Sequence, residues 1–156
     1  MYGREASVGE LLEEVDKDRL LYETSGGVTL SGGEPTMQPR FASALMGALK
    51  KRGYHTALDT CGHAKWEILE RVIADADLVL YDLKHMDSFT HREITGVTSE
   101  LIHSNLARLA ESGKSIVVRV PVIPGYNDSP KSFSDKLLEP RVETLLSEAQ
   151  LLDREL

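Results

Sequence analysis

Four short apolar segments alternate with amphipathic segments along this 156-residue chain. The apolar segments are typical of buried strands and cover residues 28–30, 54–59, 78–81 and 116–123. Helices are predicted between them, over residues 39–52, 65–74 and about 101–112. Connections of this length suit right-handed crossovers between parallel strands. The pattern therefore predicts an α/β fold built on a parallel sheet, with both faces of the sheet covered.

Local signals mark where several of these helices begin and end. Ser7 and Glu10 form the pattern of a capping box, and apolar residues follow at helical spacing down to about Tyr22. Pro39 favours the start of the next helix, and Gly53 favours its end. Four strands are too few for a closed (β/α) barrel, so we expect an open or partial barrel.

Composition and charge exclude several classes of function. The chain has 18 Lys and Arg against 25 Asp and Glu, a formal net charge of -7, and no basic cluster. A surface for nucleic acid or for an anionic membrane is therefore not expected. No apolar run reaches membrane-spanning length and the first residues lack the apolar core of a signal peptide, so we expect a cytoplasmic protein. Cys61 is the only cysteine, which excludes an internal disulfide.

Polar residues follow each predicted strand, where parallel α/β proteins bind their ligands. The four strand ends read Ser31-Gly32-Gly33-Glu34-Pro35, Asp59-Thr60-Cys61-Gly62, Asp82-Leu83-Lys84, and Arg119 followed by Pro124-Gly125-Tyr126-Asn127-Asp128. Such a set suits a zwitterionic amino-acid group: Glu34 would accept hydrogen bonds from an α-ammonium, and Lys84 would bind an α-carboxylate. The glycines would let the ligand approach the backbone closely.

Each of these residues also has a structural alternative. Gly32-Gly33 is explained equally by a tight turn, and Glu34 by a solvated loop carboxylate. Asp59 or Thr60 would serve as a helix cap, whereas Asp82 and Lys84 would form a local ion pair. The five histidines show no metal-ligand spacing, so no metal site is predicted.

In four ordered places the chain resembles the glycyl-radical-enzyme activating enzymes, radical S-adenosylmethionine (SAM) proteins that include pyruvate formate-lyase activase. The matching segments are residues 26–35, Leu58-Asp59-Thr60-Cys61-Gly62, Tyr81-Asp82-Leu83-Lys84-His85-Met86-Asp87 and residues 120–128. The opening residues 3–8 resemble the branch with a ferredoxin-like insert, which activates decarboxylases, dehydratases and carbon–nitrogen lyases. The resemblance implies a partial (β/α) barrel of the radical SAM type with parallel strands.

The resemblance also implies an activity and its cofactors. A reduced [4Fe-4S] cluster would cleave SAM, and the 5′-deoxyadenosyl radical would take hydrogen from a backbone glycine of a partner glycyl radical enzyme. A flavodoxin or ferredoxin would supply the electron. By position, Gly32, Gly33 and Glu34 would bind the methionyl amino group of SAM, and Asp82 and Lys84 would contact its carboxylate end.

Three further positions carry implied roles. Asp59 and Thr60 would lie near the carboxylate end of SAM, with a monovalent cation among them as one option. Arg119 and the loop at residues 123–128 would lie along the nucleoside or the incoming glycine loop. None of these residues is expected to be catalytic itself.

The chain departs from the family pattern at both ends. The first strand and the C-x3-C-x2-C motif that ligates the cluster are absent from these residues, and so is the last strand. We therefore expect a partial core domain at residues 1–139, lacking the first and last strands, and a divergent helical tail at residues 140–156. The alternatives are a non-catalytic remnant that binds SAM or the partner, as a fragment or degraded gene product, and an ordinary (β/α) enzyme with acid–base chemistry.

Overall fold

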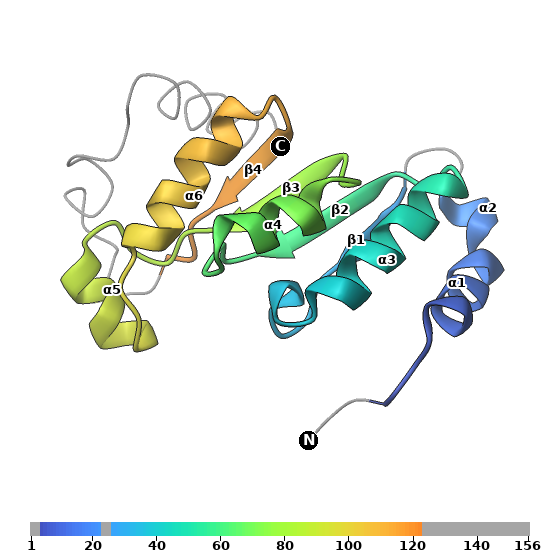
Figure 1. Cartoon of the computed structure of the whole chain (residues 1–156), viewed down its shortest axis with the longest axis horizontal. Coiled ribbons are helices and arrows are strands. Elements are labelled where there is room, and N and C mark those ends of the chain that lie inside the picture. Colours follow the sequence, from blue (N-terminus) through green and yellow to red (C-terminus); the bar gives the residue numbers. More distant parts are fainter. Residues whose placement is uncertain (1–3, 23–25, 123–156) are drawn as a thin grey trace.

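A computed structural model describes residues 4–22 and 26–122, in which four parallel strands form one sheet (Figure 1). The strands pair in chain order and are β1 (Val28–Leu30), β2 (Thr56–Thr60), β3 (Leu78–Asp82) and β4 (Ser115–Arg119). The register places Leu58 beside both Leu30 and Val79. The predicted α/β fold with a parallel sheet is confirmed, because each apolar segment forms a strand and each connection returns to start the next strand alongside.

Helices precede the first strand and fill the connections between the strands. They are α1 (Val8–Lys17), α2 (Arg19–Tyr22), η1 (Pro35–Met37, a 3-10 turn), α3 (Pro39–Lys51), α4 (Trp66–Ile73), α5 (Ser88–Thr95) and α6 (Glu100–Glu111). Successive crossovers of one hand move along the sheet in one direction, so their helices lie on the same face. Figure 1 shows α3, α4 and α6 along one side of the sheet, and their apolar side chains build the main core with β2 and β3.

The two faces of the sheet therefore differ. Val79 and Tyr81 of β3 point to the helical side and are buried, whereas Leu80, between them, points to the opposite face. Val117, which lies beside Leu80 in the register, is 40% exposed. The expectation that both faces are covered is wrong for the part of the chain that the structure describes, because α3, α4 and α6 all lie on one side.

Two element boundaries and one helix differ from the sequence prediction. The helix expected down to Tyr22 divides into α1 and α2 at Asp18, which leaves helical geometry as the C-cap of α1. The last strand ends at Arg119 rather than at residue 123, because Pro121 has no backbone N–H to donate to a neighbouring strand. Helix α5 was not predicted, although its N-cap Asp87 accepts a hydrogen bond from the Thr90 N–H.

Some predictions concern residues that the structure does not describe. These are the loop at residues 123–128, the domain boundary at residue 139 and the tail at residues 140–156, all of which stay predictions. Within residues 4–22 and 26–122, no helix has both the length and the apolar character needed to cross a membrane.

Acidic pH is expected to destabilise the fold through His103 of α6. Burial, followed by electrostatic repulsion from His91, lowers the pKa of His103 below its ordinary value and outweighs the effects of Glu100 and the His85 carbonyl. The unfolded chain then binds the proton more readily, so stability is full above the unfolded-state pKa of about 6.5 and declines as the pH falls below it. Urea unfolding between pH 7.5 and 5 measures this decline.

The matched variants are His103→Gln and His55→Gln. His103→Gln should flatten the pH dependence of the free energy of unfolding, because it removes the group that titrates. His55 is exposed, so its substitution should leave the slope as in the natural chain. Identical slopes for the natural chain and His103→Gln would show that another group is responsible.

Candidate functional site

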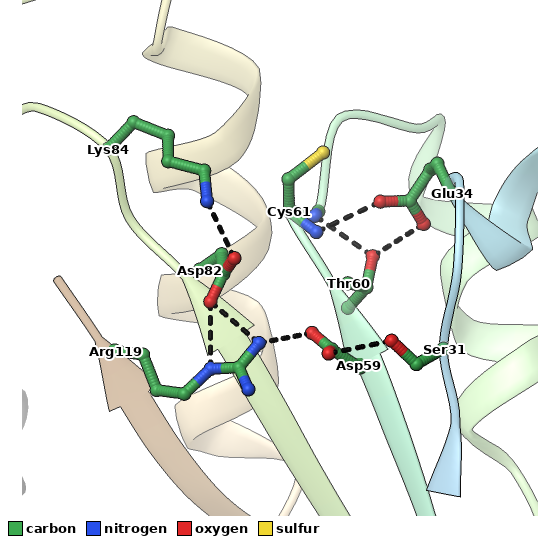
Figure 2. Close-up of polar contacts among 9 residues, drawn as sticks. Ser31, Glu34, Asp59, Thr60, Cys61, Asp82, Lys84 and Arg119 are labelled. Atoms are coloured by element: carbon green, nitrogen blue, oxygen red, sulfur yellow. Dashed lines mark hydrogen bonds and ion pairs between the residues drawn. The ribbon is translucent and has the colours of Figure 1, made fainter. Parts of the chain in front are cut away.

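Side chains from the ends of all four strands form one connected network at the carboxyl edge of the sheet (Figure 2). Arg119 donates through Nε to Asp82 Oδ1 at 2.8 Å and pairs through a terminal nitrogen with Asp59. Ser31 Oγ donates to Asp59 Oδ2 at 2.9 Å. Lys84 Nζ donates to Asp82 Oδ2 at 2.6 Å. We call these five residues the ion network.

Sheet register explains why residues so far apart in the chain meet here. Asp82 lies directly beside Arg119 in the pairing of β3 with β4. Asp59 lies beside Leu80, two residues before Asp82, so the two carboxylates point to the same face of the sheet. That face is the one opposite α3, α4 and α6.

The charges of the ion network balance, with two carboxylates and two cations. Partial burial opposes the ionisation of Asp82, but hydrogen bonds and attraction from Lys84 and Arg119 outweigh burial and hold the pKa of Asp82 below its ordinary value. Asp82 is therefore ionised at neutral pH. A ligand carboxylate that approached Lys84 would exchange with Asp82 for the same ammonium group.

Glu34 forms a second set of contacts beside the ion network, as Figure 2 shows for Thr60 and Cys61. Its Oε1 accepts from the Thr36 N–H at 3.2 Å, from Thr36 Oγ1 at 2.9 Å and from Thr60 Oγ1 at 2.8 Å. Its Oε2 accepts from the Cys61 N–H at 2.9 Å. Burial raises the pKa of Glu34, but the bonds from Cys61, Thr60 and Thr36 together lower it below its ordinary value.

These contacts give Glu34 a structural task that the sequence did not reveal. Its carboxylate ties the loop after β1 to the loop after β2 and caps the N-terminus of η1. Its Oε2 faces the loop after β2, where the Cys61 N–H donates to it. A role for Glu34 as acceptor of a ligand ammonium stays a prediction.

Gly32 and Gly33 leave a stretch of open backbone between β1 and Glu34. Their φ angles are +88° and +51°, in the left-handed region that favours glycine. A side chain built at either position would have no heavy atom within 4 Å. The chain bends at this pair, and both exposed glycines leave their backbone accessible to a ligand.

The structure also decides between other structural alternatives. Neither Asp59 nor Thr60 caps α4, whose N-cap is Lys65 with no side-chain hydrogen bond. Instead, Asp59 joins Arg119 and Ser31, and Thr60 joins Glu34. The local ion pair of Asp82 with Lys84 is present. The ligand-binding roles predicted for these residues stay predictions.

Sequence reasoning missed the residues that hold the loop after β2. The Asn105 side-chain amide donates to the carbonyls of Gly62 at 2.8 Å and Ala64 at 2.7 Å, and Asn105 is 1% exposed. Tyr81 lies against Gly62 and donates its hydroxyl to the Ile102 carbonyl at 2.7 Å. A signal for Asn105 exists: it is a lone amide on the apolar face of α6. The role of Tyr81 leaves no signal because it depends on the packing of β3 against that loop.

The residues present fit the amino-acid end of SAM. The ammonium of Lys84 is paired with the Asp82 carboxylate, which a ligand carboxylate can replace. Gly32 and Gly33 present open backbone and directly precede Glu34, whose Oε2 can accept a hydrogen bond. They do not fit a cysteine-ligated cluster, because these 156 residues contain a single cysteine. Within the described residues no three His, Cys, Asp or Glu side chains are grouped to hold a metal ion.

Comparison with known proteins gives a consistent assignment. The sequence profile of the Radical SAM superfamily matches residues 1–137. The choline trimethylamine-lyase activating enzyme of Oleidesulfovibrio alaskensis is 50% identical over 128 residues, covering 81% of this chain and 41% of that protein. The trans-4-hydroxy-L-proline dehydratase activating enzyme of Clostridioides difficile is 47% identical over 127 residues, covering 80% of this chain and 42% of that protein.

A solved structure agrees with the sequence comparisons. A domain of pyruvate-formate lyase-activating enzyme from Bacteroides vulgatus matches with a TM-score of 0.65 and 29% identity, covering 81% of this chain and 94% of that one. The chain spans about two fifths of the length of the curated relatives it matches. The match to the family profile extends over most of the chain and includes all four strands with the ion network at their ends. This chain belongs to the radical SAM superfamily.

Proposed function

We propose that this chain binds SAM at the carboxyl ends of β1 to β4 and forms the SAM-binding core of a glycyl-radical-enzyme activating enzyme. The observation that carries the proposal is the ion network, in which Lys84 pairs with Asp82, and Arg119 pairs with Asp59 and Asp82, at the edge where parallel sheets bind ligands. The relatives support the second half of the proposal, because the curated matches named above are activating enzymes.

Each end of the methionyl group has a matching partner in the proposed site. The SAM carboxylate would take the place of Asp82 on Lys84, as a charge-assisted hydrogen bond. Asp82 would keep Arg119, so it would not be left as an unpaired charge. The SAM amino group would donate to Glu34 Oε2 and to backbone carbonyls of Gly32-Gly33, whose lack of side chains permits a close approach.

The proposed partner is a glycyl radical enzyme, and the proposed electron donor is a flavodoxin or ferredoxin, both by analogy with the family. In this family, SAM is the source of a carbon-centred radical when an iron–sulfur cluster reduces it. The residues of this chain do not supply the cluster ligands, so their proposed task is to bind and orient SAM. This chemistry is sensitive to oxygen, which agrees with a proposed location in the cytoplasm.

Binding of SAM compared with 5′-methylthioadenosine tests the site. The second ligand keeps the nucleoside and the sulfur atom but lacks the sulfonium charge and the amino and carboxylate groups that Lys84 and Glu34 are proposed to bind. We expect calorimetric titration of the chain to show SAM binding at least about 30-fold more tightly, from one or two charge-assisted hydrogen bonds. Equal affinities would show that the ion network does not recognise the methionyl group.

The cysteine count favours a second candidate, a chain that binds SAM without radical chemistry. One cysteine cannot supply the thiolates of a [4Fe-4S] cluster. This candidate predicts SAM binding but no 5′-deoxyadenosine when the chain is treated with iron, sulfide and dithionite under anaerobic conditions. Formation of 5′-deoxyadenosine in proportion to the protein would rule it out.

A further inference from the structure

We propose that Arg119 is a positioning residue of the SAM site, acting as the built-in counter-ion of Asp59 and Asp82 so that Lys84 can exchange Asp82 for the carboxylate of the ligand. This inference rests on the proposed function, because it concerns the same site. In this proposal Arg119 binds two carboxylates of the protein itself, and it does not contact the nucleoside or the incoming glycine loop.

The contacts of Arg119 join three strands. From β4, its Nε and a terminal nitrogen each lie 2.8 Å from Asp82 Oδ1 at the end of β3, and that same terminal nitrogen pairs with Asp59 on β2. Figure 2 shows the guanidinium between the two carboxylates, with Lys84 on the far side of Asp82. Asp82 therefore holds two cations, one on each oxygen, whereas Asp59 holds Arg119 and the Ser31 hydroxyl.

Charge balance explains why the second cation matters. The side chains of Asp59 and Asp82 are each only 22% exposed, and neighbouring carboxylates on one face repel each other unless a cation lies between them. Without Arg119, the Asp82 carboxylate and the carboxylate of the ligand would compete for a single cation, Lys84. Lys84 would then exchange partners only by leaving Asp82 unpaired in a half-buried position, which is unfavourable.

The geometry also explains why the residue is arginine. A guanidinium donates from several nitrogens in one plane and can hold two carboxylates at once, whereas an ammonium is a single point charge on a flexible stem. Arg119 uses two nitrogens on carboxylates from two neighbouring strands. Lysine at this position would keep the charge but lose the planar bridge.

The test compares SAM affinity in the natural chain, Arg119→Ala and Arg119→Lys, with and without about 10 mM guanidinium chloride. We expect Arg119→Ala to bind SAM about tenfold more weakly, as for loss of a charged hydrogen bond, and Arg119→Lys to be intermediate. Guanidinium should restore most of the affinity of Arg119→Ala, because it can occupy the space between the carboxylates, whereas the same concentration of sodium chloride should not. Arg71→Ala, at an exposed position of α4, is the matched control and should bind as the natural chain does.

A second measurement does not depend on SAM. Carbon-13 NMR titration of the Asp82 carboxyl should show its pKa rising in Arg119→Ala, since one of its two cations is lost, and falling again when guanidinium is added. If the natural chain binds SAM and Arg119→Ala binds it equally well, or is weakened but not rescued, the positioning role is overturned while the SAM site stands. If the natural chain does not bind SAM, the proposed function is overturned. The Asp82 titration then still decides whether Arg119 is its counter-ion.

Discussion

Replacing Gly62 by alanine is expected to lower the free energy of unfolding by about 3–5 kcal/mol, a large part of the roughly 5–15 kcal/mol of an ordinary domain. A Cβ at this position would lie 1.8 Å from the Tyr81 hydroxyl oxygen and 2.2 Å from the ring carbon that bears it. Tyr81 is fully buried and its hydroxyl is bonded to α6, so the ring cannot move aside cheaply. The φ angle of +69° adds strain for any residue with a side chain. Urea unfolding followed by circular dichroism measures the loss.

Gly53→Ala provides the matched control for backbone strain alone. Gly53 also has a positive φ, +83°, but a Cβ there would have no heavy atom within 4 Å. Its substitution should therefore cost only the left-handed strain, about 1–2 kcal/mol. Equal losses at the two positions would show that Gly62 is required only for its backbone conformation, and that the close approach of Tyr81 has no energetic weight.

The largest functional effect is expected from Lys84→Gln, which should weaken SAM binding by about 30-fold. Lys84 is the ammonium of the ion network that borders the loop after β3, and glutamine keeps much of its length but not its charge. Loss of a hydrogen bond to a charged group costs about 1.5–3 kcal/mol, which corresponds to a factor of roughly 10 to 150 in affinity. Calorimetric titration with SAM measures the change.

Lys51→Gln removes the same charge elsewhere and is the control for net charge. Lys51 is exposed in the last turn of α3, just before the chain enters β2 at the opposite edge of the sheet. It should bind SAM as the natural chain does, and both variants should unfold at similar urea concentrations. Unchanged affinity in a folded Lys84→Gln variant would contradict the assignment of Lys84 to the ligand carboxylate.

The sequence predictions succeeded for elements with a regular pattern of apolar residues and failed for elements without one. The four strands and helices α3, α4 and α6 were predicted because they bury apolar residues at regular spacing. Helix α5 was missed because its one buried residue is His91, so it has no apolar stripe. Its ends were nevertheless signalled by Asp87 as the N-cap and by Gly96, which ends the helix in a left-handed conformation.

Part of the candidate site could be predicted from the sequence, and part could not. The sequence by itself determined which residues follow each strand, because apolar runs end where polar groups can reach solvent. Only the tertiary structure decided which of them meet: Asp59 and Arg119 are 60 positions apart and touch because the register of three parallel strands places both on one face. It also decided that Glu34 ties two loops together and that Gly62 makes room for Tyr81. Such contacts depend on distances between strands and loops, which periodicity along a chain does not encode.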